Sequence, residues 1–555
     1  MTDFSLQEEL LKQRREAEER DAQRRAQKLN LPYLNPQSSK VPIEMKALAV
    51  IDEETAKKNL VAAIQKLKNK LVLAVFDPLN SQTKELIETL KKNYEIHLAI
   101  VSLSSLKNIW HFYQYMAEEG KEISGAVEID PQKLKILQES IKTIQSLKEN
   151  LEEAKTQLTS KILEIILAGA LSLKASDIHF EPTEEKGILR LRIDGLLHNT
   201  YENFSTKTYR SLINRIKLLS GLKLNIMDQP QDGRFTIKLP DRDIEIRTSV
   251  IPSEWGETVV LRILDPAALK VNLEELGWRA DDLEIIKKEI KKPNGLILNT
   301  GPTGSGKTTT LYAFLRFIFR PEIKIITIED PIEYHLPGIS QTQVNPEAGY
   351  TFASGLRSIL RQDPNVVLVG EIRDKETAEI ALNASLTGHM VFSTLHTNDA
   401  VGAVPRLMDL GIKTQILGPA LSLVIAQRLV RRLCPFCKKE KTIDRELNEK
   451  IKNFISHLPS RVEKEPLKDF KIYEPQGCDK CGGLGYRGRI SIFELFVIDQ
   501  TMEKLIYQNP TEIELKETAK KQGMVTMQQD GLIKVLEGIT SLAEVERLTG
   551  PIEWL

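Results

Sequence analysis

A short glycine-rich segment offers the clearest chemistry in this sequence. An apolar run, 295–299, precedes it, and a helix-compatible run, 309–315, follows. The segment fits the pattern G-x-x-x-x-G-K-[ST], and with the next residue it comprises Gly301, Pro302, Thr303, Gly304, Ser305, Gly306, Lys307, Thr308 and Thr309. In such a loop, backbone N–H groups surround phosphate oxygens, the lysine reaches the β and γ phosphates, and the threonine hydroxyl holds Mg²⁺. A glycine turn without function is the alternative, but lysine and threonine in register favour a nucleoside triphosphate site.

Carboxylates follow two further apolar runs. Residues 325–328 lead into Glu329 and Glu333, and residues 366–369 lead into Glu371. Aliphatic runs that end in an acid are typical of parallel strands at the active edge of a sheet, because ligands bind beyond the carboxyl ends of the strands. Such acids can position Mg²⁺ and orient an attacking water. Any one of these acids, taken alone, can instead cap the next helix.

A third apolar run lies between His389 and His396. Its polar end is predicted to sense the γ-phosphate. The alternative for these histidines is a hydrogen-bonded place in the core.

The four cysteines form two C-x-x-C pairs, Cys434 with Cys437 and Cys478 with Cys481. A disulfide framework is unusual in so long a chain without an export signal. Two dithiol turns supply the four thiolates that tetrahedral Zn²⁺ binds, and a closed site of four cysteines has no open position for a substrate. The spacing therefore predicts a structural zinc site. A redox pair or unpaired core cysteines are the alternatives.

Composition places limits on the function. Hydrophobic residues make up 41% of the 555 positions, and 77 basic residues balance 77 acidic ones, so no strong net charge attracts nucleic acid or an anionic membrane. The longest apolar stretch, residues 162–173, is shorter than the roughly 20 residues that a spanning helix needs. The charged start of the chain lacks the apolar core of a signal peptide. We expect a cytoplasmic protein that reaches a membrane only through a partner.

Periodicity predicts an α/β protein of several domains. The expected order is a charged helical or disordered arm (1–40), a first N-terminal domain (41–129), a helical linker (130–160), a second N-terminal domain (161–268), a P-loop domain (269–430), a zinc-binding module (431–490) and a helical C-terminal region (491–555).

Individual elements follow from the same patterns. Residues 71–76 and 96–101 are expected to be strands on either side of a helix at 81–90. Alternation at 189–194 predicts a half-exposed strand, whereas the apolar run 259–264 predicts a strand that is buried on both faces.

These motifs together resemble the secretion ATPase family that powers type II secretion and type IV pilus assembly, the GspE/PilB group. Residues 301–308 resemble its Walker A loop, residues 327–333 its Asp box, and residues 368–374 its Walker B segment with Glu371 in place of the usual aspartate. Residues 387–400 resemble its His box, and similar segments upstream are residues 77–80, 175–182, 192–195 and 231–234. The resemblance runs from about residue 40 to the end, and it implies a RecA-like ATPase domain behind two small α/β (α+β) N-terminal domains, the second PAS-like.

The resemblance implies roles for particular residues. Glu333 would be the catalytic base, Glu371 would bind Mg²⁺ through water, and Glu329 would support both. His389 and His396 would couple the phosphate state to movement. Arg234 and Arg247 would reach a nucleotide across a subunit boundary, with a solvent-facing salt bridge as the alternative for each.

The resemblance also implies partners. The chain would form a homo-hexameric ring that moves an inner-membrane platform protein, and its cysteine pairs separate it from the retraction ATPases, which generally lack them. Some family members begin with an R-L-G-like repeat that binds cyclic di-GMP. No such motif occurs between residues 1 and 70, so the first domain is expected to dock onto a membrane-embedded partner.

Two other functions compete with this interpretation. A nucleic-acid motor, such as a helicase or DNA-uptake ATPase, draws support from the basic residues Arg428, Arg431, Arg432, Lys438 and Lys439. The neutral overall charge and an aromatic content of 6% speak against it. A nucleotide-gated scaffold with little turnover is the third possibility, and Glu333 and Glu371 speak against that. The sequence does not separate pilus assembly from type II secretion.

Overall fold

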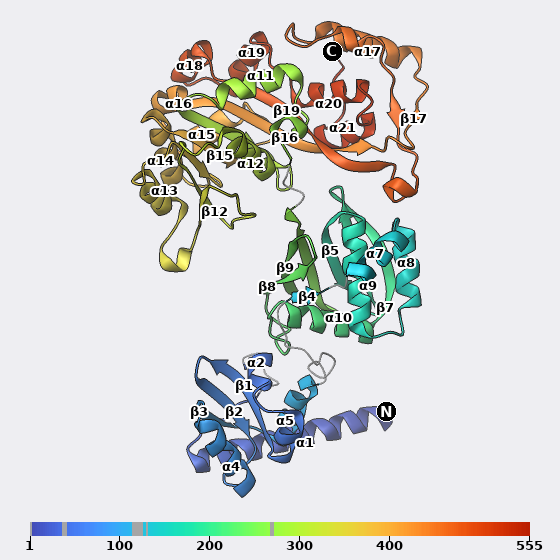
Figure 1. Ribbon diagram of the computed structural model, residues 1–555, viewed down its shortest axis with the longest axis vertical. Helices are drawn as coiled ribbons and strands as arrows, with labels where there is room; N and C mark the ends of the chain where they lie inside the picture. Colours follow the sequence, from blue (N-terminus) through green and yellow to red (C-terminus); the bar gives the residue numbers. More distant parts are fainter. Residues whose placement is uncertain (1–2, 36–40, 114–125, 129–130, 267–270, 555) are drawn as a thin grey trace. The chain divides into compact units, whose positions relative to one another are not determined.

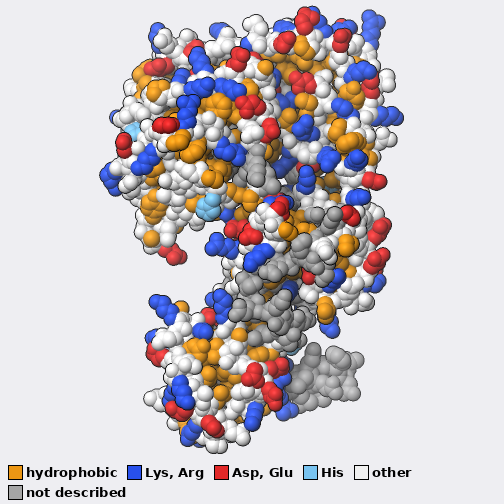
Figure 2. All heavy atoms as spheres, viewed as in Figure 1, with side chains coloured by type: hydrophobic (Ala, Val, Ile, Leu, Met, Phe, Trp, Pro, Cys, Tyr) orange, Lys and Arg blue, Asp and Glu red, His pale blue; other side chains and the backbone are white. Residues whose placement is uncertain are grey.

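The computed structural model describes residues 3–35, 41–113, 126–128, 131–266 and 271–554. The chain divides into two compact units, Met1–Asp265 and Pro266–Leu555 (Figure 1). Both contain helices and strands, which confirms the expected α/β class. Among the described residues, no helix combines the length and the apolar character that crossing a bilayer requires. Figure 2 shows basic and acidic side chains interspersed over the visible face, as their equal numbers in the sequence predict.

The first unit begins with a small domain around three strands. Its sheet has the order β1-β2-β3, in which β1 and β2 are antiparallel and β2 and β3 are parallel. Helix α4 connects the two parallel strands, and Asn80 caps its first turn. The expected strands and the helix between them are confirmed. The elements are α1 (Asp3–Leu29), α2 (Met45–Leu48), α3 (Glu53–Lys58), β1 (Val61–Leu67), β2 (Lys70–Val75), α4 (Ser81–Lys91), β3 (Glu95–Ile100), α5 (Leu103–Trp110) and η1 (His111–Tyr113).

Helix α1 belongs to this domain through its C-terminal half. Glu19 accepts hydrogen bonds from Tyr33, Ser102 and Ser105. The Arg25 guanidinium donates to the carbonyl of Phe76 and lies over its ring, 4.0 Å from the centroid. Residues 3–29 of the charged arm are therefore a helix whose C-terminal half contacts the first domain.

A seven-stranded sheet of order β4-β8-β9-β10-β5-β6-β7 follows in the same unit. Helices α9 and α10 pack against β5, β6 and β7. The elements are β4 (Ala126–Glu128), α7 (Pro131–Ser140), α8 (Ile144–Glu153), α9 (Thr159–Ser172), β5 (Ala175–Pro182), β6 (Lys186–Ile193), β7 (Leu196–Ser205), α10 (Thr206–Leu219), β8 (Gln231–Lys238), β9 (Asp243–Ser253) and β10 (Gly256–Leu264).

Three expectations for this region need correction. Strand β10 is not buried on both faces: Val259 and Leu261 are buried, whereas Arg262 is exposed. Antiparallel sheets commonly bury one face, and β10 pairs in that way with both neighbours. The helical linker is also part of the domain, because Leu147 and Leu151 of α8 are buried and α7 and α8 pack on α9. The expected boundary at residue 129 places residues 126–128 in the first domain, but they form β4, which pairs with β8 of this sheet.

The second unit is built on another seven-stranded sheet, of order β13-β12-β14-β15-β11-β16-β19. All neighbours are parallel except β16 and β19. Strand β11 is buried throughout, with Leu296 and Leu298 in the core on one face and Ile297 in the core on the other. The elements up to β15 are η3 (Leu273–Leu276), α11 (Ala280–Glu289), β11 (Gly295–Thr300), α12 (Lys307–Ile318), β12 (Ile325–Glu329), β13 (Ser340–Gln343), η4 (Pro346–Ala348), α13 (Phe352–Leu360), β14 (Val366–Val369), α14 (Lys375–Leu386) and β15 (Met390–Leu395).

The last two strands of this sheet cross the expected boundaries at residues 430 and 490. Strand β16 (Leu421–Leu433) runs into the cysteine module, and β19 (Tyr486–Val497) returns from it along β16 (Figure 1). The module and the P-loop domain therefore share one sheet. The remaining elements are α15 (Ala403–Asp409), α16 (Thr414–Ala420), β17 (Lys439–Glu440), α17 (Arg445–His457), η5 (Glu465–Leu467), β18 (Tyr473–Glu474), η6 (Asp479–Cys481), α18 (Gln500–Tyr507), α19 (Glu512–Lys521), α20 (Met527–Leu536) and α21 (Leu542–Thr549).

Candidate functional site

The glycine-rich loop joins the carboxyl end of β11 to the first turn of α12. A side chain at Gly301, where φ is 145°, would place its Cβ 2.5 Å from the carbonyl oxygen of Gln427. At Gly306, where φ is 94°, the Cβ would lie 2.8 Å from Nε2 of the same residue. Both distances are shorter than Cβ contacts allow, so only glycine fits. The predicted strand, loop and helix are thus present, and the loop is closely supported from β16.

Lys307 lies at the first position of α12 and folds over the loop. Its Nζ donates to the carbonyl oxygens of Gly301 at 2.7 Å and of Pro302 at 3.1 Å. Burial lowers the pKa of Lys307, and the charge of Glu371 acts in the opposite direction. The ammonium group is therefore held beside the loop and within the electrostatic reach of Glu371.

Glu329 ends β12 and is buried among hydrogen-bond donors. Its carboxylate accepts from the hydroxyl groups of Tyr312 and Thr327, and from Nε2 of Gln341 at 3.1 Å. Burial and the neighbouring Glu329 raise the pKa of Tyr312. Because Tyr312 belongs to α12, this carboxylate joins the helix after the P-loop to the end of β12.

The loop that carries Glu333 is fixed from β13. Gln341 donates to the carbonyl oxygen of Tyr334 at 2.9 Å and accepts from the backbone N–H of Leu336 at 2.6 Å. The same side chain donates to Glu329, so one amide connects the end of β12 to the loop that carries Glu333. Glu333 thus stands on a loop that is braced at the carboxyl edge of the sheet.

Glu371 and His396 meet at the ends of the neighbouring strands β14 and β15. Nε2 of His396 lies 3.7 Å from Oε2 of Glu371, and Arg373 forms an ion pair with the other carboxylate oxygen. Hydrogen bonding to Glu371 raises the pKa of Arg373. Arg373 is a charged neighbour of the site to which the sequence analysis assigned no role.

The structure does not bring His389 to this edge. His389 precedes β15, whereas His396 follows it, and a strand of six residues spans about 20 Å. Its Nδ1 lies 3.1 Å from the carbonyl oxygen of Ala384 near the end of α14, and its own carbonyl accepts from Gly295 at the start of β11. Within this chain, His389 therefore lies at the other end of β15 from His396 and remote from the P-loop, and the role that the resemblance gives it stays a prediction.

Arg234 and Arg247 lie in the first unit and face each other across β8 and β9. Both contact Glu245: Nη1 of Arg234 is 3.9 Å from Oε2, and Nε of Arg247 is 3.2 Å from Oε1. The Arg234 side chain is 77% exposed and that of Arg247 is 27% exposed. The two arginines are thus neighbours on the sheet, and both contact the carboxylate of Glu245.

Gln427 is a residue that the sequence analysis missed. Its Oε1 accepts from Nδ2 of Asn299 and from Oγ1 of Thr310, both at 2.9 Å, and its Nε2 donates to Oγ of Ser491 at 2.9 Å. Asn299 precedes the P-loop and Thr310 follows it, so this buried amide fixes the loop from both sides. The available signal was a lone amide in the apolar run of β16.

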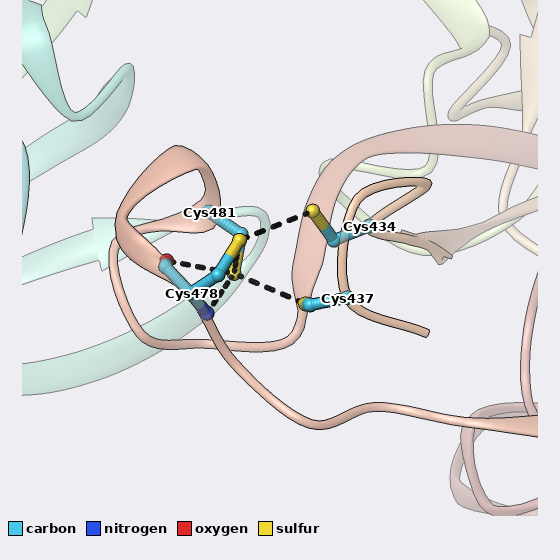
Figure 3. Close-up of side chains that lie close together, drawn as sticks. All are labelled: Cys434, Cys437, Cys478 and Cys481. Atoms are coloured by element: carbon cyan, nitrogen blue, oxygen red, sulfur yellow. Dashed lines mark hydrogen bonds between the residues drawn. The ribbon is translucent and has the colours of Figure 1, made fainter. Parts of the chain in front are cut away.

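The four cysteines form a compact cluster (Figure 3). The Sγ atoms lie 3.9 Å apart for Cys434 and Cys478, and 3.8 Å apart for Cys437 and Cys481. Tetrahedral zinc with Zn–S bonds near 2.3 Å requires S–S distances of about 3.8 Å. Backbone N–H groups of Gly477 and Gly485 also donate to sulfur, which favours thiolates. The donor set and its spacing fit Zn²⁺.

Comparison with known proteins gives the family. Residues 152–547 match the family described as Type II/IV secretion system protein, and residues 29–120 match the MshEN domain. The type IV pilus assembly ATPase PilB of Myxococcus xanthus is 36% identical over 511 residues, which cover 92% of this chain and 88% of that protein. Type II secretion system protein E of Pseudomonas aeruginosa is 45% identical over 389 residues, which cover 70% of this chain and 75% of that protein.

A solved structure shares the fold. That of the Legionella pneumophila ATPase DotB has a TM-score of 0.51 and 22% sequence identity, and the match covers 71% of this chain and 96% of that one. Neither relative is named as a nucleic-acid motor, so that alternative gains no support. With a complete P-loop at the edge of a parallel sheet, and with these relatives, the chain is an ATP hydrolase and belongs to the type II/IV secretion system protein family, in the group that contains PilB and type II secretion protein E.

Proposed function

We propose that this chain forms a hexameric Mg-ATPase that converts ATP hydrolysis into mechanical work for type IV pilus assembly or type II secretion. The observation that carries the proposal is the convergence of the P-loop, Glu371, His396 and the braced Glu333 loop at one edge of the sheet in the second unit. Parallel α/β sheets bind ligands at this edge. The names of the relatives supply the two candidate machines.

Each residue of the site would have a separate role in binding and hydrolysing ATP. N–H groups of residues 301–309 would bind the phosphates, and Lys307 would leave the loop carbonyls to contact them. Thr308 would hold Mg²⁺ directly and Glu371 through water, and the ion would neutralise phosphate charge. Glu333 would take the proton of the attacking water. Glu329 would position the loop that carries Glu333 relative to α12, through its hydrogen bonds with Tyr312 and Gln341.

Other parts would serve assembly and coupling. Arg234 and Arg247 would leave Glu245 and stabilise the transition state on a neighbouring subunit. The zinc-bound cysteines would fix the ends of β16 and β19, and His396 would report the phosphate state through Glu371. In the cytoplasm, the first domain would dock onto an inner-membrane platform protein.

The test is Mg-dependent ATP hydrolysis by the full chain and by Glu333→Gln. We expect Glu333→Gln to bind ATP and to lose most of its turnover, because the water loses its proton acceptor. Glu347→Gln is a matched control, since Glu347 is an exposed acid on the nearby helix η4. Single-stranded DNA should leave the rate unchanged. Normal turnover by Glu333→Gln would remove that residue from its role, and strong stimulation by DNA would overturn the protein-translocation proposal.

A further inference from the structure

The segment after His396, residues 397–401, connects two distant parts of the second unit. We call it the relay loop. At its start, the backbone N–H of Thr397 donates to Oγ1 of Thr300 at 2.8 Å, and the two threonine hydroxyls lie 2.8 Å apart. Thr300 is the last residue of β11, directly before Gly301. The start of the relay loop is therefore joined to the base of the P-loop.

The end of the relay loop is held by a buried acid of β19. Oε1 of Glu494 accepts from the backbone N–H of Ala400 at 2.9 Å, and Oε2 accepts from the backbone N–H of Met527 at 3.1 Å. Met527 is the first residue of α20, where a negative charge is favourable. Glu494 is only 5% exposed, so each of its oxygens depends on these N–H donors. One carboxylate thus joins the relay loop to the C-terminal helices.

A second contact runs from the same loop to α19. Oδ2 of Asp399 lies 2.9 Å from Nζ of Lys516, and Oδ1 accepts from the backbone N–H of Gly402 at 2.7 Å. Lys516 also pairs with Glu512 one turn earlier in α19. Its side chain is 46% exposed, so it can be changed with little disturbance of the core.

We propose that Glu494 and Lys516 are positioning residues for ATP hydrolysis, acting through the relay loop. They hold residues 399 and 400 so that Thr397 stays against Thr300 and His396 stays beside Glu371. Helices α19 and α20 then set the geometry of the phosphate site, and a bound nucleotide in turn changes how firmly these helices are held. The proposal rests on ATP hydrolysis at the site described above.

Steady-state kinetics of the full chain provide the first test. In Glu494→Gln, an amide nitrogen faces one of the two N–H donors, so one bond is lost. We expect kcat to fall about tenfold, because the relay loop loses one of the buried hydrogen bonds that position it. We expect the KM for Mg-ATP to stay within about twofold, because no group that contacts the nucleotide changes. For Lys516→Met we expect a fall in kcat of about twofold to fivefold, the size of a surface ion pair. Lys516→Arg should restore the rate, and Lys520→Met, an exposed change on the same helix, should leave it unaltered.

Hydrogen exchange distinguishes a positioning role of Glu494 and Lys516 from a variant that is inactive only because it is unfolded. A non-hydrolysable ATP analogue should slow amide exchange in residues 510–530 of the wild-type chain, and this effect should be lost in Glu494→Gln and weakened in Lys516→Met. If Glu494→Gln does not fold, the proposal is tested by kcat of the Lys516 variants and by hydrogen exchange of the wild-type chain. Unchanged kcat in folded Glu494→Gln and Lys516→Met, or an analogue that binds without slowing exchange in this segment, would overturn the proposal. If the wild-type chain shows the exchange effect but Glu333→Gln hydrolyses ATP normally, the proposed catalytic assignment fails while the coupling stands.

Discussion

Oε2 of Glu371 lies 3.7 Å from Nε2 of His396, although the two residues follow different strands. Strands β14 and β15 are parallel neighbours, so their carboxyl ends bring these side chains together. Arg373 occupies the other oxygen of the same carboxylate. Both carboxylate oxygens of Glu371 therefore have a partner, and any ligand that binds this carboxylate has to compete with His396 and Arg373.

Lys307→Ala should abolish tight nucleotide binding. The ammonium group is the cation that the loop holds at the predicted phosphate position, and a charged hydrogen bond contributes about 1.5–3 kcal/mol. Titration with a fluorescent ATP analogue measures the loss. Lys504→Ala, a change of an exposed lysine on α18, is the control and should bind normally. Equal affinity in both variants would contradict the assignment of Lys307.

Gln427→Ala should destabilise the protein and weaken nucleotide binding together. Asn299, Thr310 and Ser491 would each lose a buried partner, and each unsatisfied group costs about 1–3 kcal/mol. Thermal unfolding and analogue titration are the measurements. Gln508→Ala removes an exposed amide of the same unit and should change neither. A stable Gln427→Ala protein with normal affinity would show that the P-loop does not depend on this amide.

Removal of zinc should destabilise the end of the second unit's sheet, where β16 and β19 enter the cysteine module. Apparent zinc-binding free energies in small modules are about 10–16 kcal/mol, so the segment around Cys434 and Cys481 depends on the ion. We expect one zinc per chain by elemental analysis, its release in Cys434→Ser, and faster proteolysis between residues 434 and 486. A module that resists protease after complete chelation would contradict a structural zinc site.

Arg247→Ala should lower hydrolysis without lowering nucleotide affinity. An arginine that stabilises phosphoryl transfer across a subunit boundary contributes about 10³–10⁵ in rate. Mixing Arg247→Ala with Lys307→Ala chains tests the geometry, because a shared interface could combine an intact arginine with an intact P-loop and regain activity. Arg210→Ala, an exposed change on α10, is the control. Normal ATP hydrolysis by Arg247→Ala alone would show that Arg247 does not act in phosphoryl transfer, and Arg234→Ala would become the variant to examine.

Local patterns predicted the parts of this molecule that local chemistry determines. The P-loop between β11 and α12 needs glycines at fixed positions, and the clustered cysteines need only two tight turns brought together. Contacts set by tertiary structure were not predictable in this way. The contacts of Gln427 and Glu494 depend on which strand lies beneath which loop.

The errors have the same origin. The apolar run 259–264 predicts burial on both faces, but only one face of β10 is buried in its antiparallel sheet. The resemblance gives His389 and His396 a common role, whereas β15 places the two histidines at its opposite ends, and only His396 lies beside Glu371. Lysine- and glutamate-rich residues 130–160 predict a linker, but Leu147 and Leu151 pack into the domain.

The pairing of β16 with β19 has a consequence for synthesis of the chain. Strand β19 pairs along β16 from Leu423 to Leu433, with the whole cysteine module between them in sequence. A ribosome must therefore release residue 497 before the outer strand of the nucleotide-binding sheet is present. Domains generally fold as units during synthesis. Nascent chains that stop before β19 therefore leave the backbone groups of β16 unpaired on that side, and such an edge is open to pairing with strands of other chains.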